Sequence, residues 1–227
     1  MASDSVGKLV DQLVCKSIVV LVSGKGSNLQ AIIDAVETAQ ISATISAVIS
    51  NVSDAYALKR ANNAGIVAEV VDHTQFDSRE SFDAALQNVI EQYNPDLVVL
   101  SGFMRLLTQP FVEFYEGRML NIHPSLLPKY RGLNTHQRAL DAGDYEHGAS
   151  VHFVTPDLDS GPAIIQAVVA IEQDDTVITL AKKVFKEEHI IYPLAISWFV
   201  EGRLKMKSGQ AELDNQVLSS PVIHKDK

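Results

Sequence analysis

From residue 17 onward, the chain alternates short apolar runs with longer amphipathic segments. Four runs are almost entirely apolar and rich in β-branched residues, as expected for parallel strands that are buried on both faces. These runs are residues 17–22, 45–50, 67–71 and 97–100, and a fifth strand is predicted at residues 119–122. Strands that alternate with helices in this way predict an α/β fold with a parallel sheet.

The amphipathic segments predict the helices that connect these strands. The first helix is expected to start with Ser27 as its N-cap and to bury one apolar face. That face carries Leu29, Ile32, Ile33 and Val36. Further helices are predicted at residues 56–64, 79–93, 110–115 and 176–200.

Two later runs, residues 150–154 and 163–171, predict a hairpin-like pair of strands around a turn that contains Asp159. The predicted fold is therefore a Rossmann-like, mostly parallel twisted sheet flanked by helices on both faces, with this late hairpin-like element and a long C-terminal helix. We expect one domain at residues 17–205. Residues 1–16 form an N-terminal extension, and residues 206–227 are a C-terminal tail with weak signals.

Composition narrows the classes of function. The 227 residues are 46% hydrophobic and 21% charged, which is typical of a globular protein. A formal net charge of −9 opposes binding to nucleic acid, although small anions remain possible ligands. We find no apolar stretch of about 20 residues and no targeting segment, so we expect no membrane association and a cytoplasmic location. Cys15 is the one cysteine, which excludes an internal disulfide.

The first predicted strand runs into a glycine-rich loop, Ser23-Gly24-Lys25-Gly26-Ser27-Asn28, followed by a helix. Backbone N–H groups at a helix N-terminus can bind an anion. The loop lacks the Lys-Ser/Thr ending of a P-loop and the third glycine of a dinucleotide site, so it suits a single phosphate. A tight turn without a ligand is an equally good interpretation of the loop alone.

A second candidate site lies at the end of the fifth strand. Asn121 and His123 share one face of that strand because strand side chains alternate with period two. In open parallel sheets the carboxyl ends of the strands border the ligand crevice. If the late turn folds over this pair, Asp159 could orient the imidazole of His123 and favour its protonated form. Structural roles are expected for the other histidines, His73, His136, His147, His152, His189 and His224.

Asn121 and His123 belong to a long motif, Asn121-Ile122-His123-Pro124-Ser125-Leu126-Leu127-Pro128-Lys129-Tyr130-Arg131-Gly132. This motif resembles the signature of the folate-dependent formyltransferases. The loop at residues 23–32 and the segments 102–107, 157–162 and 188–189 resemble the phosphoribosylglycinamide formyltransferase branch of that family. The resemblance covers about residues 17–205. It implies formyl transfer from 10-formyltetrahydrofolate to glycinamide ribonucleotide in purine biosynthesis, with no metal.

The resemblance also implies roles for individual residues. Asn121, His123 and Asp159 would be catalytic, the first two as donors to the oxyanion and Asp159 as the support of His123. Glycinamide ribonucleotide would bind to Gly26, Ser27 and Asn28 in the N-terminal half of the domain, and to Glu188 in the C-terminal half. The folate site would be lined by Arg79, Met104, Arg105, Leu106, Leu107, Asn121 and Asp159. Arg79 would lie nearest the glutamate tail.

One position departs from the family pattern. Three residues before Glu188, the family often has a polar side chain near the phosphate, whereas this chain has Phe185. Lys186 is a possible substitute.

Three alternatives remain open on the sequence. A methionyl-tRNA formyltransferase shares part of the motif but adds a tRNA-binding domain for which we expect no room here. A formyltetrahydrofolate hydrolase would use water as the acceptor, and a non-catalytic phosphate-binding α/β module would keep the fold alone. We expect a monomer or a homodimer whose partners are small-molecule substrates.

Overall fold

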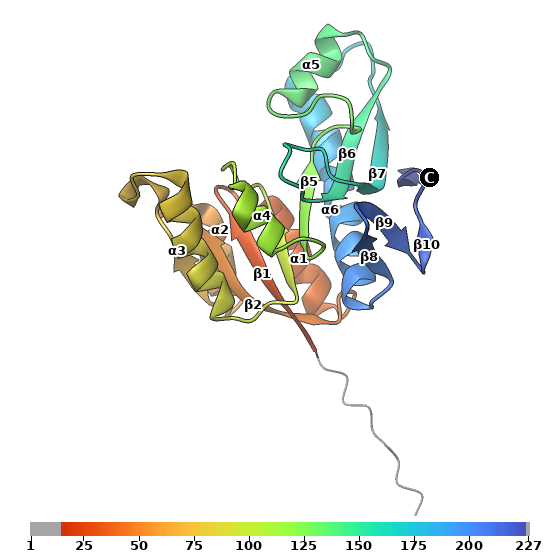
Figure 1. Cartoon of the computed structure of the whole chain (residues 1–227). Coiled ribbons are helices and arrows are strands. Elements are labelled where there is room, and N and C mark those ends of the chain that lie inside the picture. Colours follow the sequence, from red (N-terminus) through yellow and green to blue (C-terminus); the bar gives the residue numbers. More distant parts are fainter. Residues whose placement is uncertain (1–14, 226–227) are drawn as a thin grey trace, which may run out of the picture.

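A computed structural model describes residues 15–225 of the chain (Figure 1). The predicted extension at residues 1–16 therefore lies mostly outside the described residues. The helices are α1 (Ser27–Glu37), α2 (Tyr56–Asn63), α3 (Arg79–Glu91), α4 (Gln109–Phe114), α5 (Thr135–Asp141) and α6 (Val177–Val200), with a 3-10 turn at His73–Gln75. The strands are β1 (Lys16–Val22), β2 (Ala43–Ser50), β3 (Ala68–Val70), β4 (Leu97–Leu100), β5 (Met119–His123), β6 (Glu146–Phe153), β7 (Ala163–Ala170), β8 (Leu204–Lys207), β9 (Gln210–Leu213), β10 (Gln216–Val217) and β11 (Val222–Lys225).

The main sheet has eight strands in the order β11-β7-β6-β5-β4-β1-β2-β3. Strands β5, β4, β1, β2 and β3 pair in parallel, each with its neighbour in this order. Strand β6 is antiparallel to both β5 and β7. This arrangement confirms the predicted mostly parallel α/β sheet with a late hairpin-like pair. The carboxyl ends of β1, β4 and β5 lie at one edge of the sheet, where the candidate residues were expected.

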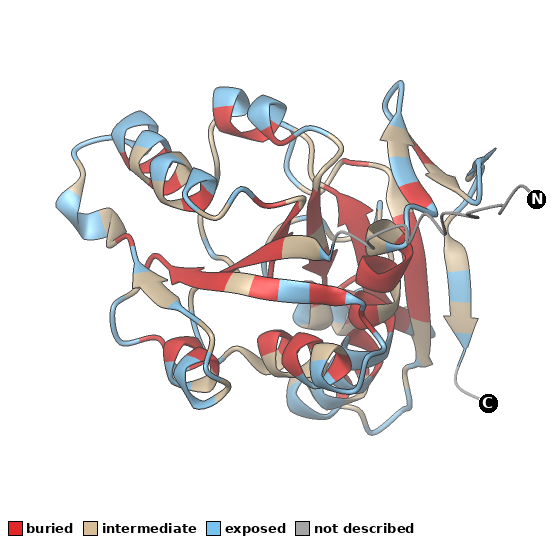
Figure 2. Ribbon diagram, turned by 90° about the horizontal axis from the view of Figure 1, so that it is seen from below, coloured by how far each residue is buried: buried red, intermediate tan, exposed pale blue. Residues whose placement is uncertain are grey.

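Alternating side chains of each buried strand serve the two faces of the sheet. In β1, Ile18, Val20 and Val22 pack into one hydrophobic cluster, and Val19 and Leu21 pack into the other. The first cluster includes residues of α1, α2 and α6, and the second includes residues of α3 and α4. Figure 2 shows buried residues along the central strands and on the helix sides that face them. Helices therefore cover both faces, as predicted.

The start of α1 differs from the prediction. The helix begins at Ser27, and its N-cap is Gly26, which has a φ of 69° and gives no side-chain cap hydrogen bond. The Ser27 N-cap prediction was wrong because the chain enters the helix through a left-handed residue, a conformation that glycine adopts without steric cost.

Two regions carry elements that the sequence did not predict. Helix α5 follows the motif at residues 121–132 and starts after Asn134, a non-glycine residue with a φ of 58°. Near the C-terminus, β8, β9 and β10 form a small antiparallel sheet, and β11 pairs with β7 in parallel at the edge of the main sheet. Strand β7 is thus paired on both sides, and β11 is the edge strand. Within the described residues, no helix is long and apolar enough to cross a membrane.

Candidate active site

Strand β5 places Asn121 and His123 on the same face, at the carboxyl end of the parallel part of the sheet. The antiparallel neighbour β6 sets His152 opposite Asn121 and Ser150 opposite His123. The switch from parallel to antiparallel pairing occurs at β5, so loops from both halves of the chain meet here (Figure 1).

The turn between β6 and β7 brings Asp159 to His123. The distance from His123 Nδ1 to Asp159 Oδ2 is 3.3 Å, and each side chain is only 7% exposed. His123 Nε2 lies 2.9 Å from the carbonyl oxygen of Tyr130. Both ring nitrogens therefore face oxygen acceptors, an arrangement that suits a ring with a hydrogen on each nitrogen.

Asp159 is itself held in place by the motif loop. The backbone N–H of Gly132 donates a hydrogen bond to Asp159 Oδ2 at 2.9 Å. Asp159 has a φ of 47°, in the left-handed region that Asp tolerates better than most residues. The turn is thus shaped to aim this carboxylate at His123.

His152 belongs to the same cluster, although the sequence suggested only a structural role for it. Its Nδ1 lies 2.8 Å from the carbonyl of Phe153, and its Nε2 lies 3.2 Å from Asn121 Nδ2. Burial lowers the pKa of His152 to about 4, so the ring is neutral near pH 7. The Nδ1 hydrogen must then point to the Phe153 carbonyl, which leaves Nε2 to accept a hydrogen bond from the Asn121 amide. The β5–β6 register, which sequence periodicity does not supply, was the missing signal.

The glycine-rich loop packs tightly on α2. A Cβ atom at Gly26 would lie 2.7 Å from the Cβ atom of Ala57, so only glycine fits there. Ala57 N donates to the Gly24 carbonyl at 3.0 Å, and Arg60 Nε donates to the Lys25 carbonyl at 2.9 Å. The first N–H groups of a helix have no intrahelical partner, so those at the start of α1 can donate to a ligand.

Glu188 of α6 meets this loop. Asn28 Nδ2 donates a hydrogen bond to Glu188 Oε2 at 2.7 Å, across 160 residues of sequence. Burial raises the pKa of Glu188 to about 7, and the hydrogen bond from Asn28 partly opposes that shift. Asn28 Oδ1 is buried and has no hydrogen-bond partner among the described residues. The pair therefore offers acceptor atoms for a ligand that carries N–H donors.

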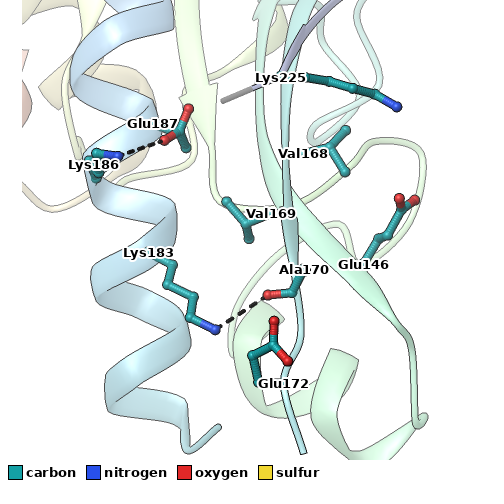
Figure 3. A pocket seen from close by; sticks show the side chains of 9 residues that line it. All are labelled: Glu146, Val168, Val169, Ala170, Glu172, Lys183, Lys186, Glu187 and Lys225. Carbon is teal, nitrogen blue, oxygen red and sulfur yellow. Dashed lines mark hydrogen bonds and ion pairs between the residues drawn. The ribbon is translucent and has the colours of Figure 1, made fainter. Parts of the chain in front are cut away.

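The preceding residues of α6 face another part of the molecule. Lys186 and Glu187 line a hollow of about 420 Å³ between α6 and strands β6, β7 and β11, and the Lys186 Nζ to Glu187 Oε1 distance is 4.0 Å (Figure 3). Two residues along a helix turn the side chain through about 200°, so Lys186 points away from the side on which Glu188 meets Asn28. The suggestion that Lys186 substitutes for a polar residue at Phe185 is not supported.

The loop after β4 carries the residues expected to line a folate site. The side chains of Met104 and Leu106 are 70% and 55% exposed, so this loop presents apolar surface to solvent. The Arg105 guanidinium lies 5.0 Å from the ring centroid of Phe82 in α3. Arg79, at the start of α3 and one turn before Phe82, is exposed at the same end of the sheet.

Comparisons with known proteins identify the family to which the chain belongs. A family model described as formyl transferase matches residues 16–196. The chain belongs to the formyl transferase family. This formyl transferase is 56% identical over 202 residues to the phosphoribosylglycinamide formyltransferase of Escherichia coli (strain K12), a match that covers 89% of the chain and 95% of the relative. It is therefore an enzyme of the transferase class that the motif suggested.

Two further matches extend the comparison. The solved structure of the phosphoribosylglycinamide formyltransferase of Coxiella burnetii has a TM-score of 0.89 and 53% identity to the formyl transferase described here, and covers 92% of this chain and 99% of that one. The human trifunctional purine biosynthetic protein adenosine-3 is 44% identical over 189 residues, which is 83% of this chain and 19% of that protein. A formyl transferase segment can thus form part of a longer polypeptide.

Proposed function

We propose that this formyl transferase moves the formyl group of 10-formyltetrahydrofolate to the amine of glycinamide ribonucleotide, a step of de novo purine biosynthesis. The observation that carries the proposal is the contact between His123 and Asp159 beside Asn121, made by residues that are distant in sequence. The names of the similar proteins support the choice of acceptor and of pathway.

In the proposed reaction the acceptor amine attacks the formyl carbon, and the electron pair of the carbonyl bond moves to oxygen. Asn121 and His123 donate hydrogen bonds to that oxyanion, because stabilising developing charge with placed donors is the largest single contribution to many such reactions. To do so, the Nε2 hydrogen of His123 leaves its present acceptor, the carbonyl oxygen of Tyr130, and donates to the formyl oxygen instead. Asp159 keeps the ring charged and aimed.

The oxyanion then re-forms the carbonyl, and the bond between the formyl carbon and the folate nitrogen N10 breaks. The electron pair of that bond stays on N10, which takes up a proton. The acceptor amine loses one proton, so His123 or a water molecule beside it carries a proton from one nitrogen to the other. The products are the formylated amine and tetrahydrofolate, and the atoms and charges balance.

The acceptor site is proposed to span the glycine-rich loop and Glu188. Gly26, Ser27 and Asn28 bring the N-terminus of α1 to the phosphate group. Glu188 and the unpaired Asn28 Oδ1 are two acceptor atoms, which suits the N–H groups at the glycinamide end. The ionised form of Glu188 binds an amine better than its neutral form does.

The donor site is proposed to lie along the loop after β4. Met104 and Leu106 present exposed apolar surface for the flat rings of the folate, and Leu107 in the same loop is partly buried against the core. Arg79 and Arg105 present charge for the folate carboxylates. Asn121 and Asp159 border the same space from β5 and from the late turn. Within the described residues, no group of three or more His, Cys, Asp or Glu side chains is placed to hold a metal ion.

One assay tests the proposal. The purified enzyme is mixed with 10-formyltetrahydrofolate in EDTA, with and without glycinamide ribonucleotide, and tetrahydrofolate formation is followed by absorbance. We expect formation only when the ribonucleotide is present. Equal rates without it would instead identify a hydrolase, and phosphate binding without turnover would identify a non-catalytic module. Sedimentation of the same sample tests the prediction of a monomer or a homodimer.

A further inference from the structure

The hydroxyl group of Ser23 connects three loops at the carboxyl edge of the sheet. Ser23 directly follows β1 and opens the glycine-rich loop. Its Oγ accepts a hydrogen bond from the backbone N–H of Met104 at 2.7 Å and donates one to Asn51 Oδ1 at 2.5 Å. Asn51 directly follows β2 and is 3% exposed. The loops after β4, β1 and β2, three neighbouring strands, are therefore joined through one side chain.

The two substrate loops depend on this hydroxyl to different extents. The glycine-rich loop has four other hydrogen bonds: from Ala57 N to the Gly24 carbonyl, from Arg60 Nε to the Lys25 carbonyl, from Gln30 N to the Gly26 carbonyl and from Asn28 Nδ2 to Glu188 Oε2. Among the residues that the structure describes, segment 102–107 makes only one hydrogen bond with other segments, from Met104 N to Ser23 Oγ. Removing the hydroxyl should therefore loosen the loop after β4 much more than the glycine-rich loop.

The hydrogen-bond network also makes removal of the Ser23 hydroxyl costly in free energy. Without the hydroxyl, the buried Asn51 Oδ1 loses its hydrogen bond from Ser23, and the Met104 N–H loses its acceptor. Leaving a buried polar atom unpaired is more costly than the net value of the bond itself. The loop after β4 then keeps the packing of Phe103 and Leu107 but loses its hydrogen bond to the loop after β1.

We propose that Ser23 is a positioning residue that holds the loop of residues 102–107 in place for the formyl donor. The inference rests on the proposed function, because that loop is the proposed folate site. Ser23 does not itself touch the reacting atoms in this assignment. It sets the affinity of one substrate while leaving the affinity of the other nearly unchanged.

The first experiment compares Michaelis constants in three variants. Ser23→Ala should raise the KM for 10-formyltetrahydrofolate about tenfold while the KM for glycinamide ribonucleotide stays within about twofold. Ser23→Thr keeps the hydroxyl and should restore most of the donor affinity. Ser17→Ala is the matched control, because Ser17 lies at the other end of β1 and its hydroxyl bonds to Ser46 Oγ at 2.7 Å. Its loss should leave both constants unchanged.

Three results would overturn the proposal. One is an unchanged donor KM in Ser23→Ala, another is an equal rise in both constants, and the third is the same rise in Ser17→Ala. A wild-type enzyme without transfer to glycinamide ribonucleotide would refute the proposed function instead, and that outcome is seen before any variant is made.

A second measurement needs no activity. In the unmodified protein, NMR hydrogen exchange should show the Met104 amide protected by at least about tenfold relative to an exposed amide. Ser23→Ala should remove that protection while the amides of Ala57 and Gln30, which bond to the glycine-rich loop, keep theirs. A Met104 amide that exchanges at the rate of a free peptide in the wild-type protein would refute the anchor, even if Ser23→Ala does not fold.

Discussion

The amide nitrogen of Asn121 lies 3.2 Å from Nε2 of a neutral His152, so the histidine fixes which way the amide faces. If Nε2 carried a hydrogen, it would repel the NH2 group and turn the carbonyl of Asn121 toward the reacting oxygen. In the proposed reaction, the buried, neutral ring would thus keep a hydrogen-bond donor available for the oxyanion.

We expect His152→Phe to lower kcat by about 10-fold to 100-fold, because a freely turning amide spends part of its time with the wrong end toward the substrate. Full loss of one oxyanion donor costs about 10² to 10³. The KM for glycinamide ribonucleotide should stay close to the wild-type value, since the proposed acceptor site lies at Asn28 and Glu188. A crystal structure of the variant shows whether the amide has turned. Unchanged kcat would mean that β5 alone orients Asn121.

The pair of His123 and Asp159 predicts a loss of turnover without loss of folding. His123→Ala should reduce kcat by about 10² to 10⁴, the usual contribution of a placed acid or base. Asp159→Asn should reduce kcat less, because an amide can still accept from the ring but carries no charge. Steady-state rates measure both effects, and circular dichroism checks the fold. His224→Ala, at the edge strand β11, is the control and should keep normal turnover.

Glu188 predicts a pH dependence of acceptor binding. Its pKa of about 7 means that the carboxylate forms only as the pH rises through 7, so the KM for glycinamide ribonucleotide should rise as the pH falls below that value. Glu188→Gln should raise this KM about 100-fold near pH 8 and remove its dependence on Glu188 ionisation. Glu187→Gln is a matched control, because Glu187 is equally buried but faces the hollow beside β11. A similar loss in both variants would contradict the assignment.

The same carboxyl group predicts a change in stability with pH. The folded pKa of Glu188 lies above the ordinary value of 4.5, so the folded protein holds this proton more tightly than the unfolded chain does. Its contribution is fully present below about pH 4.5 and is lost as the pH rises through 7, with a total on the order of 3 kcal/mol. Urea unfolding of the wild type between about pH 4.5 and 7 measures this change in the free energy of unfolding. The Glu188→Gln variant, measured in the same way, should lack it.

The glycine-rich loop predicts different outcomes at its two glycines. Gly26→Ala places a Cβ 2.7 Å from Ala57 Cβ at a φ of 69°, so it should destabilise the protein by roughly 2 kcal/mol and raise the acceptor KM at least about tenfold. A Cβ at Gly24 meets nothing within 4 Å, so Gly24→Ala should change little. Thermal unfolding and steady-state kinetics distinguish the two. Equal behaviour would show that the loop adjusts its backbone.

The periodic segments of the chain were predictable because local chemistry decides them. Apolar, β-branched runs such as residues 17–22 and 97–100 favour buried strands, and the long amphipathic segment before Val200 favours a packed helix. Asn121 and His123 were placed on one face by strand geometry alone. The motif around them indicated the formyl transferase family, and the family match at residues 16–196 confirms it.

The elements that were missed depend on contacts that are distant in sequence. Helix α5 is only seven residues long and gives little periodicity. The strands after Gly202 are two to four residues long, and β11 exists as a strand because β7 offers it an unpaired edge. At the N-cap of α1, a Cβ on residue 26 would clash with Ala57, which lies thirty-one residues later in the chain.

The sequence by itself determined the layered α/β architecture, the strand that carries Asn121 and His123, and the glycine-rich start of α1, since each follows from residue types within one segment. Only the tertiary structure decided that Asp159 reaches His123, that His152 accepts from Asn121, that Glu188 meets Asn28 and that Ser23 holds the Met104 backbone. Those contacts join segments up to 160 residues apart. They depend on strand order and register, which are set by the packing of the whole chain.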